Sequence, residues 1–148
     1  MKKDKIFEKV KNIVEKEEDK DSKLKKICLL LHNQFEGYDW VGFYLVENGE
    51  LVLGPYVGEP TDHTNIDFGE GVCGQAADRE QTYLVDDVKQ EENYLSCSPE
   101  VESEIVVPIF REGEVIGELD IDSHEKNRFS GDDKEFLEDI AEVVGKIL

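Results

Sequence analysis

Two cysteines, Cys73 and Cys97, are the residues of this chain best suited to redox chemistry. Cys73 lies in a glycine-rich segment, residues 69–77, that is typical of the entry to a helix, and Cys97 lies in a polar loop. Neither belongs to an apolar periodic stripe, so we expect both thiols to be able to meet solvent and a substrate. Cys28 falls within a helical apolar stripe, residues 24–35. Free cysteine behaves as a small hydrophobic side chain in such a stripe, so we interpret Cys28 as a core residue.

Acidic side chains on one strand form a second candidate group. Side chains alternate across a strand, so Glu118, Asp120 and Asp122 share one face. If the preceding strand pairs with this one as a hairpin, Glu104 lies near Asp120 and Asp122, although the sequence does not fix the register. In a closed site such carboxyls repel one another and the pKa of one of them rises. The cluster would then hold a substrate ammonium group and supply a proton, but a solvated sheet edge that resists aggregation explains the same residues equally well.

Two aromatic residues are a third candidate. Trp40 and Tyr44 flank Gly42 on one face of an expected strand, and such a pair could wall a pocket for an apolar, polarisable group. From these residues alone, ordinary packing of the two rings is the interpretation we favour.

Local electrostatics favour Cys73 over Cys97 as the nucleophile. Cys73 lies near an expected helix N-terminus, where the helix dipole and free N–H groups stabilise a thiolate. Cys97 has no comparable aid, and acidic residues crowd its loop. A metal site is not expected, because the chain has no Cys-x-x-Cys motif and His32, His63 and His124 are scattered.

The composition limits the partners and the location. The formal net charge of −19 at pH 7 argues against nucleic acid and anionic membrane surfaces as partners. No apolar run approaches the ~20 residues of a membrane span, and the start of the chain lacks the apolar centre of a signal peptide. We therefore expect a cytoplasmic protein, whose 3 cysteines are free thiols or part of a catalytic disulfide.

The helices that must position these groups lie near both ends of one expected domain, residues 1–148. Helical spacing of apolar residues predicts helices at residues 6–14, 24–35 and 136–147. Ser22 is the expected cap of the second helix. Ser130 with Asp133 resembles a capping box at the start of the last.

The strands are expected between these helices. Their pattern predicts strands at residues 40–46, 51–56, 82–85, 105–110 and 115–121. Asn48-Gly49 and Glu112-Gly113 are expected hairpin turns. Two long polar loops, residues 57–70 and 86–98, flank a short helix at about residues 72–78. We predict an α+β fold, in which a central antiparallel sheet carries the terminal helices on one face and the loops on the other.

Five segments of the chain resemble the free methionine-(R)-sulfoxide reductases, single-domain enzymes with the GAF fold. The segments are Trp40-Val41-Gly42-Phe43-Tyr44, Leu53-Gly54-Pro55, Gly69-Glu70-Gly71-Val72-Cys73-Gly74, Ser103-Glu104-Ile105-Val106-Val107-Pro108 and Leu119-Asp120-Ile121-Asp122-Ser123. The cysteine in the glycine motif, the Leu-Asp-Ile-Asp-Ser segment and a second cysteine before Ser-Glu-Ile-Val are the most specific features. The resemblance implies one GAF domain and a thiol-dependent oxidoreductase acting on a sulfur group, without a cofactor.

The resemblance also implies a role for each thiol. Cys97 matches the catalytic cysteine, which attacks the sulfur of free methionine sulfoxide and is left as a sulfenic acid when methionine leaves. Cys73 would condense with it to a disulfide, which thioredoxin or a similar dithiol would reduce. This assignment disagrees with the local electrostatics. We follow the resemblance, because a substrate pocket and a closed lid could supply hydrogen-bond donors that the sequence does not reveal.

The remaining candidates match the binding site of the family. Glu104, Asp120 and Asp122 match acids that hold the substrate ammonium, one of which would protonate the sulfoxide oxygen. Trp40 and Tyr44 match aromatic residues around the methyl-sulfur end. The substrate carboxylate would meet backbone N–H groups at a helix start. The resemblance also suggests a homodimer through the terminal helices, although amphipathic helices pack within one chain equally well.

One position departs from the family. Members commonly carry a further cysteine ten residues before the one in the glycine motif, and here that position is His63. Either Cys73 is then the internal resolving thiol or an external thiol resolves Cys97 directly. Two other functions stay open: a stand-alone GAF domain that senses a small ligand, and a thiol redox switch without turnover. The redox switch leaves Trp40, Tyr44 and the acidic cluster unexplained.

Overall fold

The structure is a computed structural model that describes residues 2–95 and 98–148. Its helices are α1 (Lys2–Glu15), α2 (Lys20–Gln34), α3 (Gly71–Arg79) and α4 (Gly131–Val144), with a 3-10 helix η1 (Val88–Gln90). Its strands are β1 (Trp40–Glu47), β2 (Glu50–Val57), β3 (Asn65–Asp67), β4 (Tyr83–Val85), β5 (Ser103–Arg111) and β6 (Glu114–Ser123).

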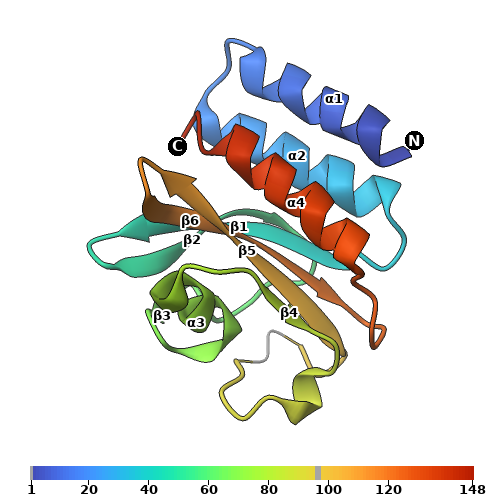
Figure 1. The fold of residues 1–148 in the computed structure, drawn as a ribbon, viewed down its shortest axis with the longest axis vertical. Helices are drawn as coiled ribbons and strands as arrows, with labels where there is room; N and C mark the ends of the chain where they lie inside the picture. The colour runs from blue at the N-terminus through green and yellow to red at the C-terminus, as the bar shows by residue number, and fades with distance from the viewer. Residues whose placement is uncertain (1, 96–97) are drawn as a thin grey trace.

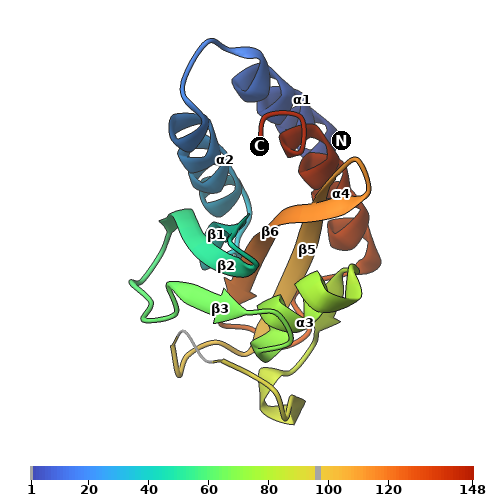
Figure 2. The same cartoon turned by 90° about the vertical axis from the view of Figure 1, so that its left-hand side faces the viewer.

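The strands form one antiparallel sheet with the order β3-β2-β1-β6-β5-β4. Helices α2 and α4 pack on one face, and α1 packs against both of them (Figure 1). In the turned view the sheet lies between this helical layer and α3 (Figure 2). The α+β fold and the terminal helices on one face are thus confirmed.

The two expected hairpin turns are present. Asn48 and Gly49, between β1 and β2, have φ angles of 52° and 80°, and Glu112 and Gly113, between β5 and β6, have φ angles of 51° and 84°. Positive φ at both central positions is the backbone that tight two-residue hairpins require. The turns therefore set β1 against β2 and β5 against β6.

The structure corrects three expectations about local elements. The cap of α2 is Asp19 and not Ser22, because the Asp19 side chain accepts the backbone N–H of Ser22 at 3.1 Å and its hydroxyl at 2.8 Å. The first long loop contains β3, which pairs with β2. The second contains η1. The capping box at the start of α4 is confirmed.

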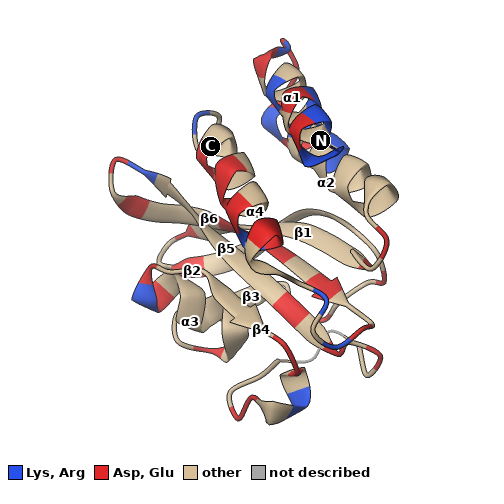
Figure 3. Ribbon diagram, turned by 45° about the vertical axis from the view of Figure 1, so that its right-hand side comes forward, with Lys and Arg blue, Asp and Glu red and all other residues tan. Residues whose placement is uncertain are grey.

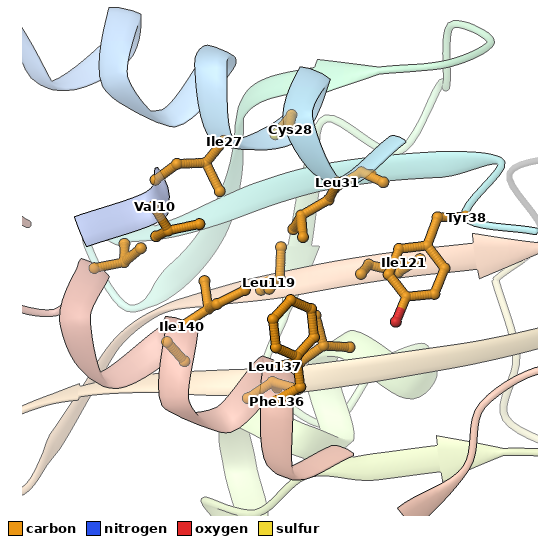
Figure 4. Packing of buried hydrophobic residues seen from close by; sticks show 14 of the residues in the cluster. Val10, Ile27, Cys28, Leu31, Tyr38, Leu119, Ile121, Phe136, Leu137 and Ile140 are labelled. Carbon is orange, nitrogen blue, oxygen red and sulfur yellow. The ribbon is translucent and has the colours of Figure 1, made fainter. Parts of the chain in front are cut away.

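Two hydrophobic clusters lie on opposite faces of the sheet. Between the sheet and the helical layer, the buried residues include Val10, Ile27, Cys28, Leu31, Tyr38, Leu119, Ile121, Phe136, Leu137 and Ile140 (Figure 4). Burying one such Leu, Ile or Phe side chain stabilises the fold by about 1.5–3 kcal/mol. Cys28 is fully buried here, with its Sγ 3.6 Å from the Pro55 carbonyl, so its interpretation as a core residue is confirmed.

Strand β1 divides its side chains between the two clusters. Val41 and Phe43 belong to the helical side, whereas Trp40 and Tyr44 belong to the cluster that α3 covers. This confirms the predicted alternation. No helix among the described residues has the length and apolar character needed to cross a membrane. Acidic residues lie on the helix surfaces and also within the strands of the sheet (Figure 3). Four of those in β5 and β6 are buried, namely Glu104, Glu118, Asp120 and Asp122.

Candidate active site

Three rows of side chains run across β1, β6 and β5 on the face that α3 covers. Asp122 pairs with Trp40 on one side and with Glu104 on the other. One row further, Asp120 lies between Gly42 and Val106. These pairings settle the register that the sequence left open. Glu104 lies directly opposite Asp122 and diagonally beside Asp120.

The third row is Tyr44, Glu118 and Pro108. Glu118 shares its face with Asp120, because side chains two residues apart on a strand point the same way. Glu118 was expected to belong to the acidic cluster, but the family resemblance implied no role for it. The structure puts it next to the other acids and beneath α3.

All four carboxyl groups are buried, so the cluster is not a solvated sheet edge. The exposed fractions are 4% for Glu104, 0% for Glu118, 1% for Asp120 and 1% for Asp122. Burial raises the pKa of Glu104 well above 4.5, and the neighbouring Asp120 and Asp122 raise it further. Burial likewise raises the pKa of Glu118, with a contribution from Asp120. These two carboxyl groups therefore hold their protons to higher pH than exposed acids do.

Asp120 differs from Glu104 in one respect. Burial raises its pKa, but hydrogen bonds with Glu104, Cys73 and Asp122 act in the opposite direction. The same hydrogen bond with Asp120 raises the pKa of Glu104. Asp120 is therefore the acceptor and Glu104 the donor of the pair. Of these two acids, Asp120 ionises first and Glu104 keeps its proton longer.

The aromatic residues beside the acids form a stack. The ring of Trp40 lies 5.4 Å from that of Tyr56 at 18° and 6.5 Å from that of Tyr44 at 29°. Its Nε1 donates to the Glu59 carbonyl at 3.0 Å, and the hydroxyl of Tyr44 donates to the His63 carbonyl at 2.9 Å. Each ring therefore has a fixed position over the sheet.

Gly42 makes this stack possible. A Cβ atom on Gly42 would lie 2.6 Å from Cζ3 of Trp40 and 2.8 Å from Cβ of Tyr56, closer than real Cβ atoms approach. The indole ring therefore lies across the strand where a side chain would otherwise stand. The glycine in the Trp-x-Gly-x-Tyr pattern is therefore required for the packing of the indole ring over β1.

The glycine motif brings Cys73 into the site. Gly69 and Gly71 have φ angles of 90° and 66°, which allow the sharp turn into α3. Gly74 has no room for a Cβ atom, because the carbonyl oxygen of Asp67 occupies that space. Cys73 is the third residue of α3, so the expected position near a helix N-terminus is confirmed.

The expected solvent access and thiolate character of Cys73 are wrong. Its exposed fraction is 5%, and it belongs to the hydrophobic cluster between α3 and the sheet. Burial raises the pKa of the Cys73 thiol well above 9.0, and Asp120, Glu118, Glu104 and Asp122 raise it further. The acids face the thiol from the sheet beneath α3, and burial together with these acids outweighs the helix dipole.

Sequence analysis missed Asn93, which joins the second long loop to the glycine motif. Its Oδ1 accepts the backbone N–H of Gly71 at 2.8 Å, and its Nδ2 donates to the Gly69 carbonyl at 2.8 Å. Gln75 of α3 adds a bond to the Asn93 carbonyl at 3.1 Å. Leu95 fills the space beside Gly71 that a Cβ atom would need. A long-range side-chain bond of this kind leaves no local signal in the sequence.

Cys97 lies outside the described residues. Its neighbour Ser98 lines a small cavity together with Asp39, Trp40, Glu59, Val101, Asp122 and His124. A second cavity is lined by Tyr44, His63, Ile66, Gly71, Val72, Cys73, Leu95, Glu104 and Asp120. The second cavity has room for about one water molecule. Trp40 thus lines a space beside Asp122, and Tyr44 lines one beside Glu104 and Asp120.

Three of the buried groups form a set that could ligate a metal ion. Single ligand atoms of Cys73, Glu104 and Asp120 all lie within 4.8 Å of one another. These residues are far apart in the chain and come from α3, β5 and β6, so no spacing motif in the sequence indicates the set.

Comparison with known proteins places this site in a family. The GAF domain model matches residues 19–148. The free methionine-R-sulfoxide reductase of Escherichia coli is 37% identical over 119 residues, which is 80% of this chain and 72% of that protein. The chain belongs to the free methionine-R-sulfoxide reductase family of GAF domains. The family and fold that the sequence motifs indicated are therefore confirmed.

Solved structures of the family have the same fold. The free methionine-R-sulfoxide reductase from Neisseria meningitidis, in complex with its substrate, superposes with a TM-score of 0.93 at 37% identity, over 98% of this chain and 87% of that chain. The reduced form of the Staphylococcus aureus enzyme superposes with a TM-score of 0.92 at 38% identity, over 99% and 94%. These relatives are oxidoreductases, which confirms the enzyme class expected for this chain.

Proposed function

We propose that this chain reduces free L-methionine-(R)-sulfoxide to L-methionine, as a single GAF domain of residues 1–148. One observation carries the proposal: Cys73, Glu104 and Asp120 are buried around one cavity beside Tyr44. A thiol, a protonated acid and an aromatic wall are what sulfoxide reduction needs. The likeness to reductases over most of the chain supports the substrate.

The acids are assigned separate tasks in this proposal. Asp120, which ionises before Glu104, binds the substrate ammonium together with Asp122. Glu104 keeps its proton and donates it to the sulfoxide oxygen, which makes that oxygen a better leaving group. Trp40 and Tyr44 hold the methyl-sulfur end, since sulfur groups make favourable contacts with aromatic rings.

We propose the following thiol steps. The Cys97 thiolate attacks the sulfoxide sulfur. The protonated oxygen is then transferred from that sulfur to Cys97 Sγ as the new sulfur–sulfur bond breaks, so that methionine leaves and Cys97 becomes a sulfenic acid. Cys73 then attacks Cys97 Sγ, so that a disulfide forms and the sulfenic oxygen leaves as water. The raised pKa of Cys73 requires a base for this step. Asp120, which has lost its ammonium partner by then, takes the thiol proton and passes it to the departing hydroxyl group, which leaves as water. A dithiol of the thioredoxin class restores both thiols.

Substrate entry requires displacement of the loops in this mechanism. The cavity around Cys73 has room for about one water molecule, whereas the substrate is an amino acid. Leu95 and His63, which line this cavity, belong to the two long loops. We infer that these loops open for the substrate and close over it, which excludes water from the reacting sulfur.

The oligomeric state and the cellular location of the protein also belong to the proposal. We propose a cytoplasmic homodimer that contacts through the terminal helices, and Leu29 on α2 is an exposed large hydrophobic residue on that layer. Light scattering of the purified chain tests the dimer. A monomeric mass at micromolar concentration would contradict it.

The deciding experiment measures methionine release with dithiothreitol as reductant. The free R epimer, the free S epimer and a peptide-bound sulfoxide are compared. Release from the free R epimer alone supports the proposal. The Cys97→Ser variant, checked for folding by circular dichroism, should release none. Absence of release from all three substrates, with folded protein and titratable thiols, would instead indicate a GAF domain that senses a ligand.

A further inference from the structure

We propose that the substrate-free site binds one zinc ion through Cys73, Glu104 and Asp120, with Glu118 as the fourth ligand. The geometry of the first three residues is the starting point. Their ligand atoms lie within 4.8 Å of one another. Ligand atoms on a tetrahedral zinc ion lie about 3.4–3.6 Å apart, which follows from Zn–S and Zn–O bond lengths. Side-chain shifts of about an ångström bring these three ligand atoms to that spacing. Glu118, which lies outside this set of three, must turn toward them to complete the site.

The buried carboxyl group of Glu118 is independent support for a ligand in this space. Its side chain is fully buried, and among the described residues neither of its carboxyl oxygens has a hydrogen-bond partner of normal geometry, although the Cys73 thiol lies close enough to lower its pKa. It points to the same face of β6 as Asp120 and lies close enough to Cys73 to affect the thiol. A buried carboxyl group without a partner costs free energy, and a cation at the centre of the cluster would remove that cost.

The donor set selects the kind of cation. A thiol sulfur with carboxylate oxygens suits zinc, which accepts both. Magnesium and calcium take six or more oxygen ligands, often including several waters. The cavity has room for about one water molecule, so a hydrated magnesium ion does not fit. A tetrahedral zinc ion held by four side chains needs no bound water.

Zinc binding would also satisfy the charges of the cluster. The ion displaces the proton of Cys73 and those of its carboxyl ligands, and these protons pass to solvent. No bond other than the coordinate bonds forms, and no group is oxidised. The resulting ion pairs replace a set of repelling acids. The bound thiolate is then shielded from alkylating agents and oxidants.

The consequence for activity rests on the proposed function. If Glu104 and Asp120 hold the substrate, zinc and methionine sulfoxide occupy the same groups and cannot bind together. Zinc would act as a reversible competitive inhibitor, while Cys73 stays protected during metal excess. The binding site itself does not depend on that function.

Cobalt(II) titration tests the site directly. The titrations use the reduced full chain with Cys97→Ser, so that Cys97 cannot supply a ligand. We expect saturation at one Co²⁺ per chain, with a sulfur-to-cobalt charge-transfer band in the near ultraviolet that one equivalent of Zn²⁺ abolishes. Mg²⁺ should not compete. The added change Cys73→Ser should abolish the band, and Cys28→Ser, the matched change in the other cluster, should leave it.

Glu118→Gln should weaken Co²⁺ binding by roughly tenfold or more, because one anionic ligand is lost. The absence of saturable binding, or a band that survives Cys73→Ser, would overturn the proposal. If Cys73→Ser fails to fold, alkylation of the Cys97→Ser protein decides the question: one equivalent of Zn²⁺ should slow iodoacetamide labelling of Cys73, and unchanged labelling would overturn the site.

A single-turnover assay separates the two proposals. Reduced wild-type enzyme, without added thiol, is mixed with methionine sulfoxide in the presence or absence of one equivalent of Zn²⁺. Competition predicts a slower turnover at low substrate that high substrate restores. Zinc binding without this effect would keep the metal site but contradict the placement of the substrate at Glu104 and Asp120.

Discussion

Glu104 and Asp122 lie directly opposite each other on β5 and β6, and both carboxyl groups are buried. Residues directly opposite on neighbouring strands have Cβ atoms about 4.5–5.5 Å apart, and like charges at such positions are destabilising. The pair therefore favours a proton on Glu104, whose pKa is raised by burial and by the neighbouring Asp120 and Asp122. The arrangement stores a proton where the proposed reaction consumes one.

Glu104→Gln should reduce kcat by about 10²–10⁴-fold, because the amide cannot donate a carboxylic proton to the sulfoxide oxygen. The wild-type rate should fall as pH rises through the raised pKa of Glu104, and the variant should lose this alkaline limb. Steady-state kinetics across pH measure both effects. Glu102→Gln, a neighbouring acid paired with Lys89, is the control and should keep the wild-type profile. An unchanged kcat in Glu104→Gln would assign the proton to another group.

Gly42→Ala should lower kcat/KM by about tenfold or more and destabilise the fold by about 1–3 kcal/mol, because the new methyl group displaces the Trp40 ring. Kinetics and thermal unfolding measure the two effects. Gly131→Ala is the matched control, since a Cβ atom there meets no atom within 4 Å. Wild-type kinetics in Gly42→Ala would mean that the indole position does not matter for substrate binding.

Asn93→Ala should leave the melting temperature nearly unchanged and lower kcat/KM, because it removes two hydrogen bonds between the loop and the glycine turn. The bonds lie on a partly exposed surface and contribute about 1 kcal/mol to loop closure. Hydrogen exchange should show faster opening of residues 90–95. Asn33→Ala, at an exposed position on α2, is the control. If exchange does not change, the loop closes without Asn93.

Glu118→Gln should stabilise the protein at pH 8. In the folded state the pKa of Glu118 is raised well above 4.5, so the folded state keeps this proton at pH values where the unfolded chain has lost it. The contribution of this group to stability is therefore greatest at acid pH. That contribution decreases as pH rises from 4.5 through the raised pKa. An uncharged Gln removes the decrease, and we expect a gain on the order of 1–2 kcal/mol at pH 8. Thermal melts from pH 5 to about pH 9 measure it, and Glu135→Gln on the surface of α4 should show no gain.

The local elements were predictable because their signals are local. Asn48-Gly49 fixed one hairpin, and Ser130 with Asp133 fixed the start of α4. Strand β3 was missed because it has three residues, of which two are exposed and polar. Ser22 was mistaken for a cap because Asp19 stands three residues earlier and its carboxylate is the stronger acceptor.

The site was predictable in part. The alternation along each strand predicted the face that Trp40, Tyr44 and the acids share, whereas only the family resemblance implied their roles. The rows that these side chains form depend on the register between neighbouring strands. The sequence of a single strand does not specify that register. The burial of Cys73 results from the packing of α3 on the sheet, a contact between distant segments. The role of Cys97 stays a prediction, because this residue lies outside the described part of the chain.

The alternation of side chains along β1 limits where the chain can gain or lose residues. Successive residues of this strand face opposite clusters, with Val41 and Phe43 toward the helices and Trp40 and Tyr44 toward the acids. Inserting or deleting one residue within 40–44 would exchange the two faces, so that aromatic site residues enter the core and core residues enter the site. Length changes in this region should therefore be tolerated only at the Asn48-Gly49 hairpin tip, which makes this tip the natural place to graft a tag or a reporter.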